Sequence, residues 1–301
     1  MKTCKTSPLP FVPTSKHATG TLWLIPHDRN RKMIGKQDII EGLEEVWGAW
    51  EDFGSNLSEN EWMTPSRCPG WTVKDNLAHI VGTENMLAGN PAPENSTEGE
   101  HIRNPIGEAN EKWVESFRNL PGAEVLKAFR EITSERLEVL RQLTEEEFAN
   151  VGWTPAGEAP YGRFMQIRIY DSWLHLQDCR EPLNKPGDED GKSAEISVQE
   201  VTQAIGYIVG KRGKAPQGSR VEISLIGPIV KTLRVSVEEK AELVELFDEE
   251  PTVSLTLTST DFLALTGGRH DPVQYIKNGK LSLGGNQALG KQISENLAFT
   301  I

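Results

Sequence analysis

The stretch that decides the fold of the first half of the chain is RIYDSWLHLQD, residues 168–178. It contains neither Gly nor Pro, and it predicts the interior of a helix. Asp171 and His175 are four residues apart, so their side chains project from one face of that helix. Ile167 and Leu174 share this face. A carboxylate and an imidazole therefore fall within the stripe that turns toward the protein interior.

Two explanations account for this buried polar pair. Removing a charged group from water is unfavourable, and coordination of a divalent cation would offset this cost. Zinc accepts His nitrogen and Asp oxygen, and one helix can present both ligands at this spacing. In the other explanation Asp171 and His175 pair with each other, or Arg168 and Asp178 neutralise them. The spacing by itself leaves both explanations open.

The composition of the chain excludes several classes of protein. Its 301 residues are enough for one large domain or two, and the net charge of −12 argues against a general binder of nucleic acid or anionic membranes. No apolar run approaches the ~18 residues of a membrane span. The three cysteines are widely spaced and form no CxxC pair, which predicts a reducing, cytoplasmic environment.

Apolar residues at helical spacing predict a bundle of four principal helices in the first half. The helices are expected at residues 36–57, 72–87, 123–143 and 164–179, with a shorter one at 108–120 and a domain spanning 33–182. Thr72 is a predicted N-cap, with Asp75 in the first turn that follows. Residues 1–32 carry four prolines and are expected to form a poorly ordered extension. Residues 152–161 contain Gly and Pro and are expected to form a link that leads to the last helix.

Four polar residues on these helices carry separate expectations. Glu84 interrupts an apolar stripe, so it is expected to form a hydrogen bond or a salt bridge inside the bundle. His79 lies away from the centre of the same stripe, and periodicity alone predicts an exposed histidine. Arg136 and Arg141 are expected to be solvated.

The second half changes period after a predicted linker at residues 181–192. A helix at 198–209 is followed by alternating strands around residues 221–225, 233–237 and 253–257. A short helix at 260–265, a strand at 281–283 and a helix at 287–297 complete an α+β domain over residues 193–301. Gly267-Gly268 and Gly284-Gly285 lack the spacing of nucleotide-binding loops.

Two sets of motifs resemble one known family. CPGWTVKDNLAH, residues 68–79, followed by Asp171, His175 and Asp178, resembles the DinB-like metal-binding domain of the mycothiol-dependent maleylpyruvate isomerase family. LTLTSTDFLALTGGR, residues 255–269, and GGNQAL, residues 284–289, are similar to the sterol-carrier-like C-terminal domain of the same family. The implied fold is a DinB-like four-helix bundle followed by a smaller α+β domain.

The resemblance also implies a set of site residues. The metal ligands would be His79, Asp171 and His175, and the metal would be a divalent cation such as zinc. This chain has Asp171 where the family carries Glu, so the cation would lie nearer the helix. Asp178 would orient a ligand or the helix, although pairing with Arg180 is equally open.

A further residue is implied in the C-terminal domain. The family uses an arginine there to bind the substrate carboxylate, and Arg269 is the candidate for this catalytic role. A solvated Arg269 is the alternative.

The implied function is that of a metal-dependent enzyme using a low-molecular-weight, mycothiol-like thiol. In the family the thiol adds to a cis double bond, the bond rotates, and elimination yields the trans product. Thiol transfer to a small electrophile, such as one bearing a carboxylate, is equally open. The alternative is a non-catalytic protein that binds metal and ligand in an apolar interdomain cleft. Neither nucleic acid nor membrane is an expected partner, and a monomer is compatible with the sequence.

Overall fold

The computed structural model of the chain describes residues 34–97 and 99–300. The extension expected at residues 1–32 lies outside these ranges. The chain divides into two compact units, and the division falls between Gly187 and Asp188. The first unit is helical with one small β-hairpin, and the second contains a five-stranded mixed sheet among the described residues.

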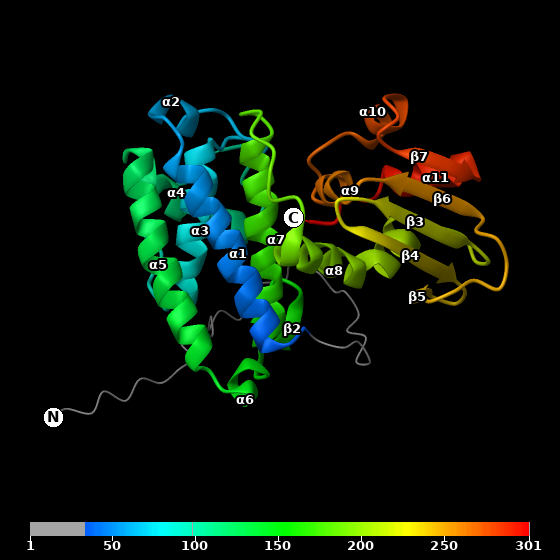
Figure 1. The fold of residues 1–301 in the computed structure, drawn as a ribbon, viewed down its shortest axis with the longest axis horizontal. Helices are drawn as coiled ribbons and strands as arrows, with labels where there is room; N and C mark the ends of the chain where they lie inside the picture. The colour runs from blue at the N-terminus through cyan, green and yellow to red at the C-terminus, as the bar shows by residue number, and fades with distance from the viewer. Residues whose placement is uncertain (1–33, 98, 301) are drawn as a thin grey trace. The chain divides into compact units, whose positions relative to one another are not determined.

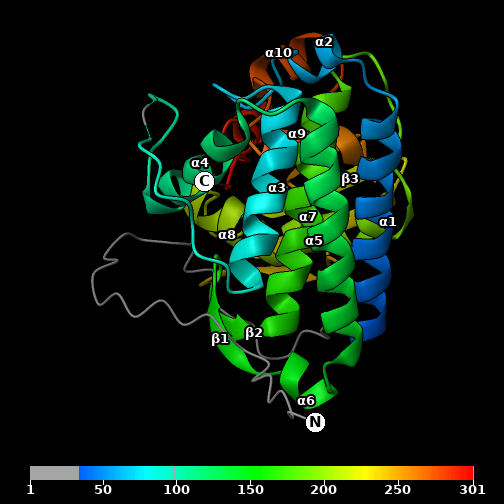
Figure 2. The ribbon, with the colours of Figure 1, turned by 90° about the vertical axis from the view of Figure 1, so that its left-hand side faces the viewer.

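The first unit is the predicted helical bundle (Figure 1). Its long helices α1, α3, α5 and α7 run side by side, as Figure 2 shows, and each contacts two of the others. The elements of this unit are α1 (Lys36–Ser55), α2 (Glu59–Trp62), α3 (Val73–Leu87), α4 (Pro105–Phe117), α5 (Gly122–Gln142), α6 (Glu145–Phe148), β1 (Val151–Thr154), β2 (Gly157–Pro160) and α7 (Tyr161–Arg180).

Apolar side chains at helical spacing close the core of the bundle, as the sequence predicts. Trp50 of α1, Leu77 of α3, Phe129 of α5 and Ile169 of α7 are all buried. Removing such side chains from water provides the main stabilisation of the bundle, about 1.5–3 kcal/mol for each large one.

The start of α3 is set by a capping box, which confirms the prediction for Thr72. The Thr72 hydroxyl accepts a hydrogen bond from the Asp75 backbone N–H, and the Asp75 carboxylate accepts one from the Thr72 N–H at 2.8 Å. Two of the otherwise unpaired donors at this helix end are thereby satisfied. The cap fixes where α3 begins and therefore which face each later residue occupies.

Helix α7 is buried on nearly all sides rather than along one stripe. It contacts α1, α3, α6 and both hairpin strands. Its buried residues include Arg163, Arg168, His175 and Asp178. The helix begins at Tyr161, three residues before the predicted start at Phe164.

The preceding link at residues 152–161 contains secondary structure that was not predicted. It forms the antiparallel hairpin β1–β2. The Thr154 hydroxyl donates to the carbonyl of Gly157 at 2.7 Å, and Gly157 takes a positive φ of 97° that closes the turn.

A buried network of charges joins α3, α5 and α7. The Glu84 carboxylate is fully buried and receives Arg136 Nε at 3.1 Å and Arg168 Nε at 2.8 Å. The salt bridge expected for Glu84 is confirmed. The expectation that Arg136 is solvated is wrong, because this side chain is only 3% exposed. Arg136 reaches Glu84 on one side and the Tyr161 hydroxyl, at 2.5 Å, on the other.

The second unit is the predicted α+β domain. Its elements are α8 (Gly191–Tyr207), the π-helical turn η1 (Ile208–Arg212), β3 (Arg220–Ile226), β4 (Val230–Val237), β5 (Ala241–Val244), β6 (Val253–Leu257), α9 (Ser259–Thr266), α10 (Pro272–Lys277), β7 (Ser282–Gly285) and α11 (Gln287–Ser294). The strand order is β5-β4-β3-β6-β7, in which only the β3–β6 pair is parallel.

Three details of this unit differ from the expectations. Helix α8 begins at Gly191, seven residues before the predicted start, and this shortens the expected linker. Strand β5 and helix α10 were not predicted, because each is short and carries little apolar periodicity. The closing helix ends at Ser294 rather than at residue 297.

The buried network supports a prediction about stability. Glu84→Gln keeps the shape of the side chain but leaves Arg136 and Arg168 without their shared countercharge. We expect the free energy of unfolding of the first unit to fall by about 3–5 kcal/mol. Urea denaturation followed by tryptophan fluorescence measures this unit selectively, because every tryptophan of the chain precedes residue 174.

Glu44→Gln is the matched control for this substitution. Glu44 pairs with Arg141 at the surface, where the two side chains are 39% and 55% exposed. Its loss should cost less than about 1 kcal/mol. Equal effects of the two substitutions would contradict the role assigned to Glu84.

Candidate metal centre

Three side chains predicted as ligands converge between α3 and α7. His79 projects from α3, and Asp171 and His175 project from successive turns of α7. His79 Nε2 lies 3.2 Å from Asp171 Oδ2, and His175 Nε2 lies 3.7 Å from Asp171 Oδ1. One potential ligand atom from each residue lies within 4.8 Å of the other two. The helical spacing brings Asp171 and His175 together, whereas His79 is added by packing.

His79 is buried, which contradicts the exposed position that periodicity predicts. Only 4% of the residue is exposed. The Trp71 ring covers it, with a centroid distance of 5.3 Å, and the His175 ring lies 4.9 Å away on another side. Burial lowers the pKa of His79 in spite of the neighbouring Asp171 carboxylate. A neutral imidazole is the form that binds a metal.

Asp171 is the most exposed of the three, with 27% of its side chain accessible. Arg168 Nη1 donates to Oδ2 at 2.6 Å. Burial opposes ionisation of the carboxyl, but Arg168 and the two imidazoles outweigh this effect and hold its pKa well below the ordinary value. Arg168 therefore neutralises Asp171, as the alternative explanation of the sequence required. The pair nevertheless leaves Oδ1 facing His175.

His175 has a different environment at each ring nitrogen. Nε2 faces Asp171, whereas Nδ1 lies 2.9 Å from Asn76 Oδ1, 3.3 Å from Asp178 Oδ2 and 3.5 Å from Cys68 Sγ. Burial disfavours the imidazolium form. Cys68, Asp171 and Asp178 overcome this penalty and raise the pKa of His175 to about 10.

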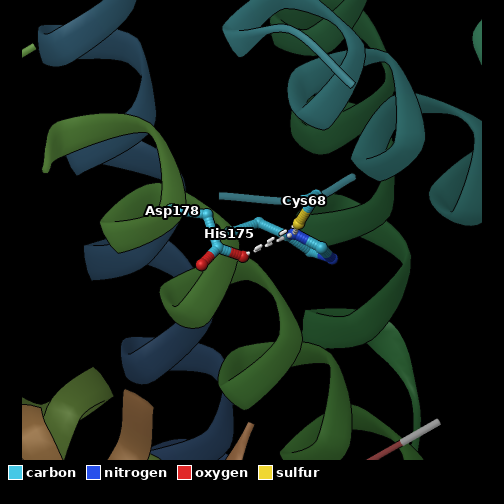
Figure 3. A group of neighbouring side chains, drawn as sticks. All are labelled: Cys68, His175 and Asp178. Carbon is cyan, nitrogen blue, oxygen red and sulfur yellow. Dashed lines mark hydrogen bonds and ion pairs between the residues drawn. The ribbon is translucent and has the colours of Figure 1, made fainter. Parts of the chain in front are cut away.

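Asp178 is fully buried and lies beside Nδ1 of His175. Arg67 Nε donates to its Oδ1 at 3.0 Å, and the Cys68 thiol donates to Oδ2 at 3.1 Å. Figure 3 shows Cys68, His175 and Asp178 pointing toward one another. The carboxylate is thus placed to orient the His175 ring, and Arg67 supplies a countercharge. The orienting role itself remains a prediction.

Arg67, Cys68 and Asn76 were not among the predicted site residues. All three belong to or adjoin the segment 68–79 that carries the family resemblance. The only signal in the sequence was the turn that precedes the Thr72 cap. In the structure this turn lies against α7, where the Arg67 backbone N–H donates to the carbonyl of Asp178 at 3.1 Å.

Arg269 lies in the second unit, directly after α9 and Gly267-Gly268. Its Nη1 donates to the carbonyl of Gly267 at 2.7 Å. Its role in binding a substrate carboxylate stays a prediction.

The donor set of His79, Asp171 and His175 fits a divalent cation. Two imidazole nitrogens and one carboxylate oxygen are common zinc ligands, and three protein ligands leave a fourth position for an exchangeable molecule. The donors lie among buried residues, and Asp171 provides the side accessible to solvent. These features define the class: a helical-bundle protein with a candidate catalytic metal centre, joined to an α+β domain.

Comparison with known proteins identifies two domains. Residues 43–180 match the mycothiol maleylpyruvate isomerase N-terminal domain, and residues 211–298 match the SCP-2 sterol transfer family. The chain therefore carries these two domains in this order, as the resemblance in the sequence implied.

Solved structures of similar fold agree with this assignment. A crystal structure of the mycothiol-dependent maleylpyruvate isomerase aligns over 79% of this chain and 90% of its own, with a TM-score of 0.51 and 14% identity. A mutant of that isomerase covers 83% and 93%, with the same TM-score and identity. At this identity the likeness shows the fold alone. No curated protein sequence matches the chain significantly.

Within residues 34–97 and 99–300, none of the helices combines the length and the apolar character that a bilayer crossing requires.

The environment of His175 leads to a prediction about pH. In the metal-free protein we expect His175 to remain an imidazolium at pH 8, since its pKa is raised to about 10. A raised pKa stabilises the folded state below the ordinary histidine pKa of about 6.5, and this contribution is lost as the pH rises toward 10. Long-range nitrogen–proton NMR of histidine-labelled protein reports the protonation state directly.

His175→Gln assigns the resonance and should remove this part of the pH dependence of unfolding. A neutral His175 ring at pH 8 in the metal-free protein would contradict the prediction.

Proposed function

We propose that the protein is a metal-dependent enzyme in which His79, Asp171 and His175 hold a divalent cation, such as zinc, that activates a low-molecular-weight thiol. The observation that carries the proposal is the convergence of these three ligand atoms within 4.8 Å of one another. The match of residues 43–180 to the mycothiol maleylpyruvate isomerase N-terminal domain supports the choice of a thiol.

The cation would supply Lewis acidity that lowers the pKa of a coordinated thiol, so that no protein cysteine is needed as the nucleophile. The chain itself has three tasks in this scheme. It holds His79 neutral by burial, keeps Asp171 ionised through Arg168, and fixes both imidazole rings against Trp71. Such preorganisation of charged and polar groups is the usual basis of catalysis in a buried site.

The proposed reaction is the isomerisation of a cis double bond or the transfer of the thiol to a small electrophile. In isomerisation the thiol sulfur adds to one carbon of the double bond and rotation follows about the resulting single bond. Elimination of the same sulfur then restores the double bond in the trans form. The proposed substrates are small and bear a carboxylate, with Arg269 as the proposed carboxylate ligand. The proposed setting is the cytoplasm, with neither nucleic acid nor membrane as a partner.

A second candidate function is a non-catalytic binding protein. Arg168 already neutralises Asp171 without any cation, at 2.6 Å, and this observation favours a bundle that needs no metal. The two candidates differ in metal content and in thiol-dependent turnover.

The test of the proposed function is elemental analysis of purified variants. We expect about one zinc per chain in the wild type and loss of that zinc in His79→Ala, because two remaining protein ligands bind the cation too weakly to retain it through purification. His270→Ala is the matched control, since His270 lies in the second unit beside Tyr275. Stoichiometric zinc in His79→Ala would defeat the ligand assignment.

Turnover distinguishes the enzyme from the binding protein. The zinc-loaded wild type should isomerise a maleyl-type substrate only when a mycothiol-like thiol is present, and His79→Ala should lose this activity. Bound zinc without thiol-dependent activity toward a panel of electrophiles would favour the binding protein instead.

A further inference from the structure

The second group of donors lies around Nδ1 of His175, the ring nitrogen that the proposed metal centre does not use. Cys68 Sγ lies 3.5 Å from Nδ1 and Asp178 Oδ2 lies 3.3 Å from it. Sγ and Oδ2 are themselves 3.1 Å apart. Figure 3 shows the three side chains meeting at one point. All three residues are buried, and the donors come from α7 and from the turn that precedes α3.

The two separations from Nδ1, 3.5 Å and 3.3 Å, match those of ligands that share one cation, whereas the 3.1 Å Sγ–Oδ2 contact is a hydrogen bond that would lengthen when a cation replaces the thiol proton. Tetrahedral zinc with bonds of roughly 2.0–2.3 Å to sulfur, nitrogen and oxygen places its ligand atoms roughly 3.3–3.6 Å apart. Asn76 Oδ1, which lies 2.9 Å from the same Nδ1, is the candidate for a fourth donor. A thiolate, an imidazole and two oxygens form a closed set of four protein ligands, which is typical of a structural or regulatory site rather than of a catalytic one.

Each donor is held in place by a neighbouring group. Arg67 occupies Oδ1 of Asp178, which leaves Oδ2 directed at the cluster. The Asn76 amide nitrogen donates to Ser66 Oγ and to the carbonyl of Thr72, both at 2.8 Å, so its oxygen faces His175. The Cys68 N–H donates to Ser66 Oγ at 3.1 Å. These contacts keep Asp178 Oδ2 and Asn76 Oδ1 directed at Nδ1 of His175.

We propose that Cys68, Asn76, His175 and Asp178 form a second cation site, selective for soft metals such as cadmium or copper(I) over zinc, that competes with the site at His79 for His175. The cation replaces the proton of the Cys68 thiol, which donates a hydrogen bond to Asp178 Oδ2. Binding converts the Cys68 thiol to a thiolate and the His175 imidazolium to a neutral ring bound through Nδ1, and both protons are released to solvent. Thiolate donors favour soft cations, whereas the set of two imidazoles and a carboxylate does not discriminate in this way.

The competition follows from the chemistry of one imidazole ring. A neutral imidazole carries one lone pair for a metal and one N–H, so a cation on Nδ1 leaves a proton on Nε2. That N–H then points at Asp171 and the first centre loses a ligand. A cation on Nε2 likewise leaves Nδ1–H to donate to Asp178 or Asn76. Occupation of the second site would switch off the first.

The test uses cadmium alone, added to the metal-free, reduced protein. We expect one equivalent to bind and to produce the near-ultraviolet charge-transfer absorption of a cadmium–thiolate bond. The same absorption should appear in His79→Ala, because the second site does not use His79. Cadmium binding by His79→Ala tests this inference, whereas zinc retention by His79→Ala tests the proposed function, so the failure of one can be told from the failure of the other.

The variants separate this cluster from the other thiols. Cys68→Ser and His175→Ala should abolish the absorption, and Asp178→Asn should weaken cadmium binding while the thiol remains. The double variant Cys4→Ser/Cys179→Ser is the matched control and should keep the full absorption. Circular dichroism of Cys68→Ser confirms that it folds, and Asp178→Asn provides a second measurement that leaves the cysteine intact.

Competition is measured by adding zinc to the cadmium-loaded protein. The wild type should hold a total of one cation per chain, while Cys68→Ser should take up one zinc at the first centre. Absorption that persists in Cys68→Ser, or that is absent from the wild type, would contradict the proposed second cation site. Simultaneous binding of one cadmium and one zinc in the wild type would overturn the exclusion.

Discussion

The interior of the helical unit depends on the balance of buried charge. Glu84 on α3 holds Arg136 of α5 and Arg168 of α7, and Arg168 in turn holds Asp171. Each charged side chain in this series lies beside one of opposite charge, which offsets the cost of removing both from water. The same series links the packing of three helices to the state of a candidate metal ligand, because it keeps Asp171 ionised at the edge of the bundle.

Helix α7 connects this network to the site chemistry. Asp171, His175 and Asp178 occupy positions four and three residues apart, so one helix face presents carboxylate, imidazole and carboxylate in turn. His175 stands between the two carboxylates and directs one ring nitrogen toward each. An arginine binds the far side of each carboxylate, Arg168 on Asp171 and Arg67 on Asp178. His175 therefore belongs to two groups of potential metal ligands, and only one of these groups contains a soft sulfur donor.

The parts of the structure that follow from local periodicity were predictable. The long helices of the bundle, the Thr72 cap and strands β3, β4, β6 and β7 of the second unit correspond to patterns in which neighbouring residues determine the outcome. The hairpin β1–β2 was missed because its four-residue strands carry too little alternation to be distinguished from a Gly- and Pro-containing link. The buried position of Arg136 was missed because its partners, Glu84 and Tyr161, are distant in the sequence.

Local periodicity was enough to predict the long helices of the bundle, strands β3, β4, β6 and β7, and the placement of Asp171 and His175 on one face, because backbone geometry repeats over a few residues and needs no distant contact. Only the tertiary structure decided that His79 turns inward to join them, since Trp71 and α7 cover a position that periodicity assigns to solvent. It also decided that Cys68 and Asn76 reach the other side of His175. Such convergence of distant segments arises from packing, which no local spacing encodes.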